Sequence, residues 1–203
     1  MYQIKKDRLP ELFAAMAKAQ DLFLPVRKCD QTNYGLWSEE VQVDLDTLKT
    51  VKSGKDCFFP QSETLYNCKN EDGKISIDPA KLTDAPFVVF GMRSCDVQGL
   101  KVLDRVFLND PVDSFYAARR EHGTVVAIAC HEPEETCFCK VFGIDAANPA
   151  ADVAAWFVGE NFYWKALTQK GEALTECVKE LLTDADEAAV EEEKKQIQAI
   201  IEK

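Results

Sequence analysis

The sequence predicts an α/β protein with a mixed sheet, a parallel core covered by helices, a C-terminal β-hairpin and a charged terminal helix. Two apolar runs, 85–92 and 124–130, have the composition of strands that are buried on both faces. Between them, 96–107 and 112–121 have the apolar spacing of helices. A strand, two helices and a second strand in this order favour neighbouring parallel strands with the helices packed on the sheet.

The N-terminal part predicts an amphipathic helix and several short strands. Apolar residues recur at helical spacing in 8–20. Short strands are expected at 22–27 and 34–39, and short extended pieces are expected within 57–78 around a turn at 71–73. The polar segment 44–56 between them is expected to form a loop or a short helix.

The C-terminal part predicts a hairpin followed by helix. Two apolar stretches within 153–168 flank Gly159, Glu160 and Asn161, which is a hairpin signal. Segment 171–203 is expected to be helical to the end of the chain, and its last part is highly charged. That part fits a solvated helix or a connector to another domain.

Composition and charge exclude several classes of protein. With 46% hydrophobic and 29% charged residues the chain is globular rather than disordered. The net charge of −11 argues against binding to nucleic acid or to an anionic membrane surface. No apolar run could span a membrane and the N-terminus lacks a secretory h-region, so we expect a cytoplasmic protein. In that compartment the eight cysteines are expected to be core thiols, metal ligands or redox groups rather than structural disulfides.

Four of the cysteines are predicted to converge. Cys95 follows the strand expected at 85–92, and Cys130 ends the strand expected at 124–130. Because the C-terminal ends of parallel strands share one edge of a sheet, these two thiols should lie close together. The short loop that carries Cys137 and Cys139 can return to the same place.

Four thiolates fit either tetrahedral Zn²⁺ or an iron–sulfur cluster. Zinc ribbons usually offer pairs of cysteines two to four residues apart, and no such pair occurs among these four. A C-x-C pair with scattered partners suits a larger group, so we favour a [4Fe–4S] cluster held by Cys95, Cys130, Cys137 and Cys139. A zinc site, buried thiols, or a thiol-redox protein that uses Cys137 and Cys139 are the alternatives.

The remaining chemistry is sparse. The other four cysteines are Cys29, Cys57, Cys68 and Cys177, and they are expected to be small buried hydrophobes. Cys57 and Cys68 could alternatively pair in space. His131 is expected in a second shell or facing solvent. Three carboxylates of the cysteine loop are expected to be solvated, and could also lower a cluster's reduction potential or form a partner-docking patch; they are Glu132, Glu134 and Glu135. No set of catalytic acids and bases is apparent, so we expect no catalytic residue and no turnover by the chain itself.

Four stretches carry a resemblance to a known family. They are FGMRSCDVQGLKVLDRVFLNDPVDSFYAARRE (90–121), VAIACHEPEETCFC (126–139), DCFFPQSETL (56–65) and WFVGENFYWKALTQKGEAL (156–174). Together they resemble the N-terminal part of sulfhydrogenase beta subunits and of the related iron–sulfur subunits of anaerobic sulfite reductases. The resemblance covers most of residues 55–180 and includes the C-D after the strand and the C-F-C.

The resemblance implies an iron–sulfur electron-transfer subunit of an anaerobic multi-subunit oxidoreductase, of hydrogenase or sulfite reductase type. Such a protein would relay electrons between ferredoxin-like clusters and a flavin or cluster of a partner subunit. Members of the family continue into a ferredoxin-like domain with two C-x₂-C-x₂-C-x₃-C-P runs, and this chain has neither run. We therefore expect 1–182 to form the iron–sulfur domain and 183–203 to form a charged helix leading toward such a domain. A zinc-stabilised or metal-free assembly domain is the alternative.

Overall fold

The computed structural model describes residues 1–201 of the chain. The main sheet contains β1 (Tyr2–Lys5), β2 (Asp21–Lys28), β3 (Gln31–Leu36), β4 (Gln42–Val43), β7 (Phe87–Met92), β8 (Gly123–Ile128), β9 (Val153–Val158), β10 (Asn161–Ala166) and β11 (Thr183–Asp184). A separate hairpin contains β5 (Tyr66–Glu71) and β6 (Lys74–Pro79). The helices are α1 (Leu9–Ala17), α2 (Ser94–Phe107), α3 (Ser114–His122), α4 (Gln169–Val178) and α5 (Ala188–Ile201), with 3-10 turns at Lys6–Arg8, Gly54–Cys57 and Lys179–Leu181.

The main sheet is mixed, as predicted. Its strand order is β11-β1-β10-β9-β8-β7-β2-β3, with β4 beside β2. Strands β7 and β8 are parallel neighbours, and the pairs β2–β7 and β8–β9 are also parallel. Every residue of β7 and β8 is buried, which explains why the two runs are apolar without alternation.

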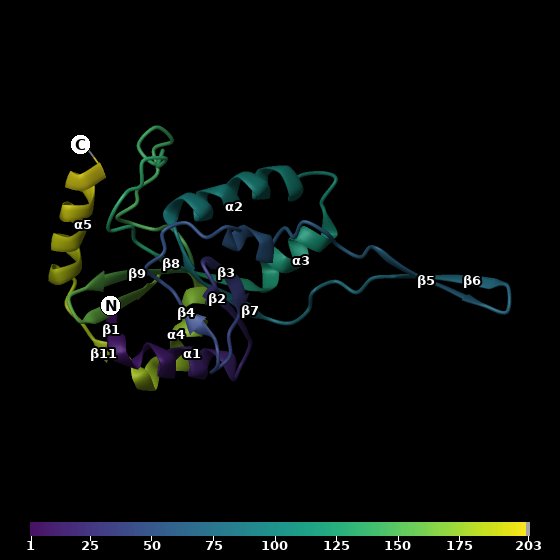
Figure 1. Cartoon of the computed structure of the whole chain (residues 1–203), viewed down its shortest axis with the longest axis horizontal. Helices are drawn as coiled ribbons and strands as arrows, with labels where there is room; N and C mark the ends of the chain where they lie inside the picture. The colour runs from purple at the N-terminus through teal and green to yellow at the C-terminus, as the bar shows by residue number, and fades with distance from the viewer. Residues whose placement is uncertain (202–203) are drawn as a thin grey trace.

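Helices cover both faces of the sheet (Figure 1). Alternate residues of β7 face opposite sides: Phe90 packs with α1 in one hydrophobic cluster, and Val89 packs with α2 and α3 in another. The rings of Phe13 and Phe90 meet edge to face at 5.1 Å between centroids. Helix α5 lies beside the β9–β10 hairpin, where Val190 and Ile197 are buried in a third cluster with Trp156. The predicted hairpin, the covering helices and the charged terminal helix are all present.

The predicted continuous helix over 171–203 is wrong in its middle. The chain leaves α4 through a 3-10 turn, forms β11 beside β1, and only then enters α5. Leu182 is buried at this point, and the main chain of 183–184 pairs with the edge strand β1, which a continuous helix could not do. Strand β1 itself was missed, because its four residues carry only a short apolar pattern. Residues 202–203 of the predicted helix lie outside the described residues.

The β5–β6 hairpin projects away from the body of the protein (Figure 1). All twelve of its residues are exposed, and its turn lies at Asp72 and Gly73, which have φ of 51° and 79°. Cross-strand register places Tyr66, Ile75 and Ile77 on one face of the hairpin. Among the described helices, none is both long and apolar enough to cross a lipid bilayer.

Candidate functional site

The four predicted cysteines line one cavity of about 200 Å³ at the C-terminal edge of the parallel strands. They reach it from three segments: Cys95 from the first turn of α2, Cys130 from just beyond β8, and Cys137 and Cys139 from the following loop. One buried water needs only about 10–15 Å³, so this space is much larger than a single-water void.

A bulge in β7 directs the chain toward Cys95. The β7–β8 register shifts between Phe90 and Met92, and Gly91 at the bulge has φ of +89°. A β-carbon at Gly91 would also lie 3.2 Å from Cδ of Pro25. Both the backbone conformation and the close approach therefore favour glycine here.

Helix α2 begins at Ser94, so Asp96 lies in its first turn rather than at its N-cap position. The Asp96 carboxylate instead accepts a hydrogen bond of 2.8 Å from Ser53 Oγ and forms an ion pair with Lys55. These contacts tie the loop before Phe58 to the start of α2. Cys95 thereby lies at the N-terminal end of a helix, where the helix dipole favours negative charge.

The C-x-C pair lies on a short helical turn that is closed by glycine. The Phe142 N–H donates to the Phe138 carbonyl at 3.3 Å. At the end of the turn, the Ile144 N–H donates to the Cys139 carbonyl at 2.9 Å and the Gly143 N–H donates to the Lys140 carbonyl at 3.3 Å. With φ of +62° at Gly143, these bonds form a Schellman motif. The turn therefore holds Cys139 in place through its own carbonyl.

Burial raises the pKa of Cys95, Cys130 and Cys139, which line the cavity. For Cys130 burial raises the pKa to about 11, partly opposed by the nearby Arg93 guanidinium. Burial is also the main cause of the raised pKa of Cys95 and of Cys139. These thiols are therefore protonated at neutral pH unless a bound metal takes the place of the protons.

Arg93 is a buried cation on the wall of the same cavity. Only 6% of Arg93 is exposed, and its Nη1 and Nη2 donate to the carbonyls of Ala129 at 3.2 Å and Leu45 at 2.7 Å. No carboxylate in residues 1–201 forms an ion pair with it. A buried charge normally has a partner of opposite sign, so this guanidinium favours an anionic group in the cavity.

Two buried side-chain polar atoms of the described chain have no hydrogen-bond partner, and both flank a predicted ligand. They are Ser94 Oγ, next to Cys95, and His131 Nε2, next to Cys130. The other ring nitrogen of His131, Nδ1, lies 2.8 Å from Glu193 Oε1 of α5. His131 is not on the wall of the cysteine cavity, in keeping with the expected second-shell position.

Sequence reasoning missed several residues of the cavity. Ile200 and Ile201 come from α5, more than sixty residues beyond the cysteine loop. Lys49 comes from the loop before the 3-10 turn at Gly54–Cys57, and its Nζ pairs with Glu134 at 3.0 Å. Arg93 had a local signal, because it is a charged residue between a fully apolar strand and Cys95. The isoleucines and Lys49 had none, because only tertiary packing brings them to the site.

The four cysteines line the cavity but do not form a finished site for a single metal ion. Within residues 1–201, no three His, Cys, Asp or Glu side chains have the spacing of ligands around one metal ion. Four sulfurs at about 2.3 Å from a shared zinc would lie about 4 Å from one another. The cysteines line the cavity without forming such a group.

The other four cysteines only partly match the prediction that they are buried hydrophobes. All eight are free thiols, so the suggested pairing of Cys57 with Cys68 is not formed. Cys57 packs against the cluster under α2 and α3, and burial raises its pKa to about 12. The prediction is wrong for Cys29, Cys68 and Cys177, which are exposed in a turn, on the projecting hairpin and on the outer face of α4 respectively.

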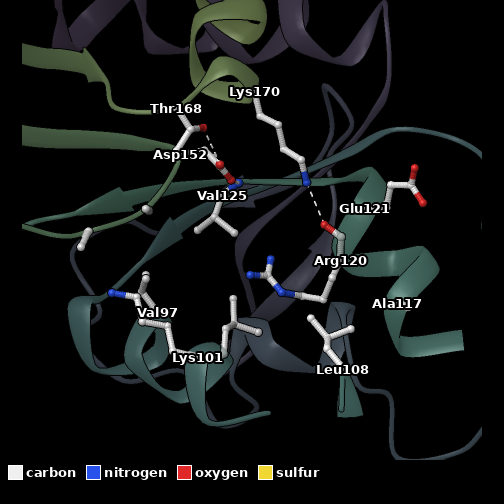
Figure 2. Close-up of a pocket in the computed structure, with 13 residues that line it drawn as sticks. Val97, Lys101, Leu108, Ala117, Arg120, Glu121, Val125, Asp152, Thr168 and Lys170 are labelled. Carbon is white, nitrogen blue, oxygen red and sulfur yellow. Dashed lines mark hydrogen bonds between the residues drawn. The ribbon is translucent and has the colours of Figure 1, made fainter. Parts of the chain in front are cut away.

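A second cavity, of about 450 Å³, lies at the opposite end of β8 (Figure 2). Its half-buried charged side chains are already bonded within the protein. Asp152 accepts from the Val125 N–H at 2.8 Å and from Thr168 Oγ1 at 2.7 Å. Lys170 Nζ donates to two carbonyls, and Arg120 pairs with Asp104 at 2.7 Å. These groups cap helices and join elements, so this larger cavity is part of the framework.

The fold and site together define an α/β domain with a four-cysteine cavity at the C-terminal edge of its parallel strands. No family model matches the chain. The chain is 29% identical over 176 residues to the beta subunit of sulfhydrogenase 2 of Pyrococcus furiosus, and the match spans 80% of this chain and 51% of that protein. The similarity supports a relation to the sulfhydrogenase beta subunits. The chain spans about half the length of this curated relative.

Proposed function

We propose that the chain is an iron–sulfur electron-transfer module of a multi-subunit oxidoreductase, of hydrogenase or sulfite reductase type. Cys95, Cys130, Cys137 and Cys139 would hold a [4Fe–4S] cluster. The observation that carries the proposal is that these four cysteines line the same cavity as a buried arginine that has no carboxylate partner within residues 1–201. The similarity to a sulfhydrogenase beta subunit supports the same class of complex.

The residues of the cavity fit an anionic cluster. Four thiolates are the usual ligands of a [4Fe–4S] centre, which would supply reversible one-electron transfer when bound. The guanidinium of Arg93 and the N-terminal end of α2 would offset the negative charge of thiolates. Ser94, with its unpartnered buried hydroxyl, is a further donor beside Cys95.

The remaining residues of the site would exclude water and adjust the potential. Ile200 and Ile201 present apolar side chains to the cavity. Glu132 and Glu134 line it as well, and carboxylates near a cluster disfavour the addition of an electron. The potential would therefore reflect the balance between these carboxylates and Arg93, with the exposed carboxylates weakened by salt.

By analogy with the longer relative, we propose that the module works beside other oxidoreductase subunits, among them one that contains a flavin. Residues 1–182 would form the electron-transfer domain. The charged segment 183–203 would lead toward ferredoxin-like clusters, and α5 within it reaches the cysteine cavity through Ile200 and Ile201. Electrons would then pass between the partner and those clusters by way of this cavity.

Anaerobic reconstitution tests the proposal. The protein is incubated with ferrous iron, sulfide and a reductant, desalted, and analysed for iron, sulfide and zinc. We expect about four irons and four sulfides per chain, with a visible absorption band that bleaches on reduction. One zinc per chain without iron would favour a zinc-stabilised assembly domain, and neither metal would favour a metal-free or thiol-redox protein.

A further inference from the structure

The turn that carries Cys137 and Cys139 also presents an apolar patch to solvent. The patch consists of Phe138, Val141 and Phe142, which are 61%, 77% and 71% exposed. Large apolar side chains are seldom left so exposed as neighbours without a function in binding. The patch is therefore a candidate binding surface next to the cysteine cavity.

The helical geometry of the turn explains why these three side chains share one side. They are spaced i, i+3 and i+4, which places them on the same face of a helical turn. The hydrogen bond from the Phe142 N–H to the Phe138 carbonyl closes one α-turn over 138–142. Cys139, between them in sequence, instead packs against the cluster that contains Trp156 and Ile197. The side of the turn that faces the protein therefore carries the proposed ligand Cys139, and the side that faces solvent is apolar.

The loop that carries the patch has more negative than positive side chains. The loop 131–143 contains three glutamates and one lysine, Lys140. Glu134 is paired with Lys49, whereas Glu132 and Glu135 are exposed and form no ion pair within residues 1–201. The whole chain carries a net charge of −11. A partner that approaches this patch is therefore favoured if its own surface is basic.

We propose that Phe138, Val141 and Phe142 form the docking surface for an electron-transfer partner. The partner would be a protein whose redox group lies under an apolar face that is rimmed by lysines and arginines. This inference rests on the proposed function and adds the surface and the chemistry of the partner. A small apolar centre with a charged rim suits the transient contacts of redox proteins, which bury little area.

The patch lies close to the proposed cluster ligands, and this position suits a docking role in electron transfer. Electron transfer requires the redox groups of two proteins to approach closely. The patch lies on the same turn as two of the four proposed ligands, Cys137 and Cys139. A partner that covers the patch would thus bring its redox group near the cluster without any movement of the fold.

Transfer to a basic redox protein tests the inference. The reconstituted, reduced chain is mixed with mitochondrial cytochrome c, a basic protein whose apolar haem edge is ringed by lysines. The variant carries Phe138→Ser, Val141→Ser and Phe142→Ser. We expect its second-order rate to fall at least about tenfold, which corresponds to about 1.4 kcal/mol. The wild-type rate should also fall as salt rises from about 0.05 M to about 0.5 M, because screening weakens steering.

Two controls separate docking from damage to the cluster. Hexaammineruthenium(III) is a small cation that needs no apolar docking, so its rate with the variant should stay within about twofold of wild type. A variant with Ile75→Ser and Ile77→Ser removes exposed apolar side chains from the distant β5–β6 hairpin and should leave both rates unchanged.

The outcomes distinguish this inference from the proposed function. If iron and sulfide fail to bind the wild-type chain, the proposed function fails and the docking inference falls with it. If the cluster forms and the triple variant reacts with cytochrome c as fast as wild type, only the docking inference is overturned. An equal slowing toward both acceptors would overturn it as well, since the side chains would then act on the cluster rather than on docking.

Discussion

The two ends of strand β8 differ in how their charges are satisfied. At the N-terminal end, beside the cavity of about 450 Å³, Arg120, Asp152 and Lys170 all form hydrogen bonds or ion pairs within the chain. At the C-terminal end, beside the cavity of about 200 Å³, Arg93 has no carboxylate partner among the described residues. The charged side chains named at the larger cavity thus have partners within the chain, whereas Arg93 at the smaller cavity has no counter-charge among the described residues.

This difference indicates which end stabilises the fold and which end binds a further group. Half-buried charges that are paired hold elements together, and breaking one pair leaves the other charge uncompensated. A buried cation without a counter-charge beside a set of thiols is costly in an isolated domain, and is typical of a site that is completed by something else. Whether the charged side chains have partners, rather than the size of the cavity, therefore distinguishes the end of β8 that stabilises the fold from the end that holds the candidate site.

The largest expected effect is the loss of the cluster when a ligand is removed. Changing Cys95, Cys130, Cys137 or Cys139 to serine should abolish or strongly reduce iron binding after anaerobic reconstitution, because a thiolate ligand is lost. Serine at Cys57 or Cys68 should leave the iron content unchanged. Iron and sulfide analysis of each variant measures this. Loss of iron on changing Cys57 or Cys68 would mean that the ligand set is wrong.

The next largest effect concerns the N-terminal end of β8, where the charged side chains are paired. Asp104 accepts hydrogen bonds from Arg120 Nε at 2.7 Å and from Tyr116 Oη at 2.6 Å. Asp104→Asn would leave the Arg120 guanidinium without its charge partner, so we expect the free energy of unfolding to fall by about 2 kcal/mol. Iron content per folded chain should not change. Urea denaturation at pH 7 and iron analysis measure the two quantities, and a loss of iron without a loss of stability would reverse the assignment of the two ends.

The same pair predicts a dependence on pH. Burial tends to raise the pKa of Asp104, but hydrogen bonds from Arg120 and Tyr116 outweigh burial and lower it below its ordinary value. A carboxyl with a lowered pKa in the folded state stabilises the protein above the pKa of about 4 that it has when unfolded. The difference in stability between wild type and Asp104→Asn should therefore be full at pH 7 and shrink as the pH falls below about 4.

The sequence predicted the parallel core and the four cysteines because both depend on local patterns. The uninterrupted apolar composition of β7 and β8 and the cysteines that follow them could be read directly. The walls of the cavity could not be predicted in this way. Lys49, Ile200 and Ile201 are brought to it by long-range packing. Strand β11 was hidden in a helical pattern, because the edge of β1 offers its main chain hydrogen bonds that no local signal records.

A substitution at Arg93 tests the converse of the Asp104 prediction: iron binding should weaken while stability changes little. Arg93→Met removes hydrogen bonds to the carbonyls of Ala129 and Leu45, which destabilises, and removes an unpaired buried charge, which stabilises. We expect the unfolding free energy of the metal-free protein to change by no more than about 1 kcal/mol. Retention of iron should fall by about tenfold, as for residues that support metal ligands. Chelator competition measures the retention, and an unaltered value would remove Arg93 from the site.

The smallest expected effect concerns the glycine that closes the cysteine turn. Gly143 has φ of +62°, and a β-carbon there would meet no atom within 4 Å. Gly143→Ala would therefore add only backbone strain, about 1 kcal/mol. That strain opposes the turn in which the Ile144 N–H bonds the Cys139 carbonyl. Because the turn holds a proposed ligand, iron loss to a chelator should become about fivefold faster.

Gly159 provides the matched control for that glycine. It has φ of +54° and equally open surroundings, but it lies in the turn between β9 and β10, away from the cavity. Gly159→Ala should cost a similar free energy of unfolding, about 1 kcal/mol, and leave the rate of iron loss unchanged. If both variants lost iron at the same faster rate, the effect would come from general destabilisation, and the cysteine turn would have no special part in holding the cluster. A faster loss in Gly143→Ala alone would tie the Schellman turn to the site, since the two substitutions add the same atom at the same kind of backbone position.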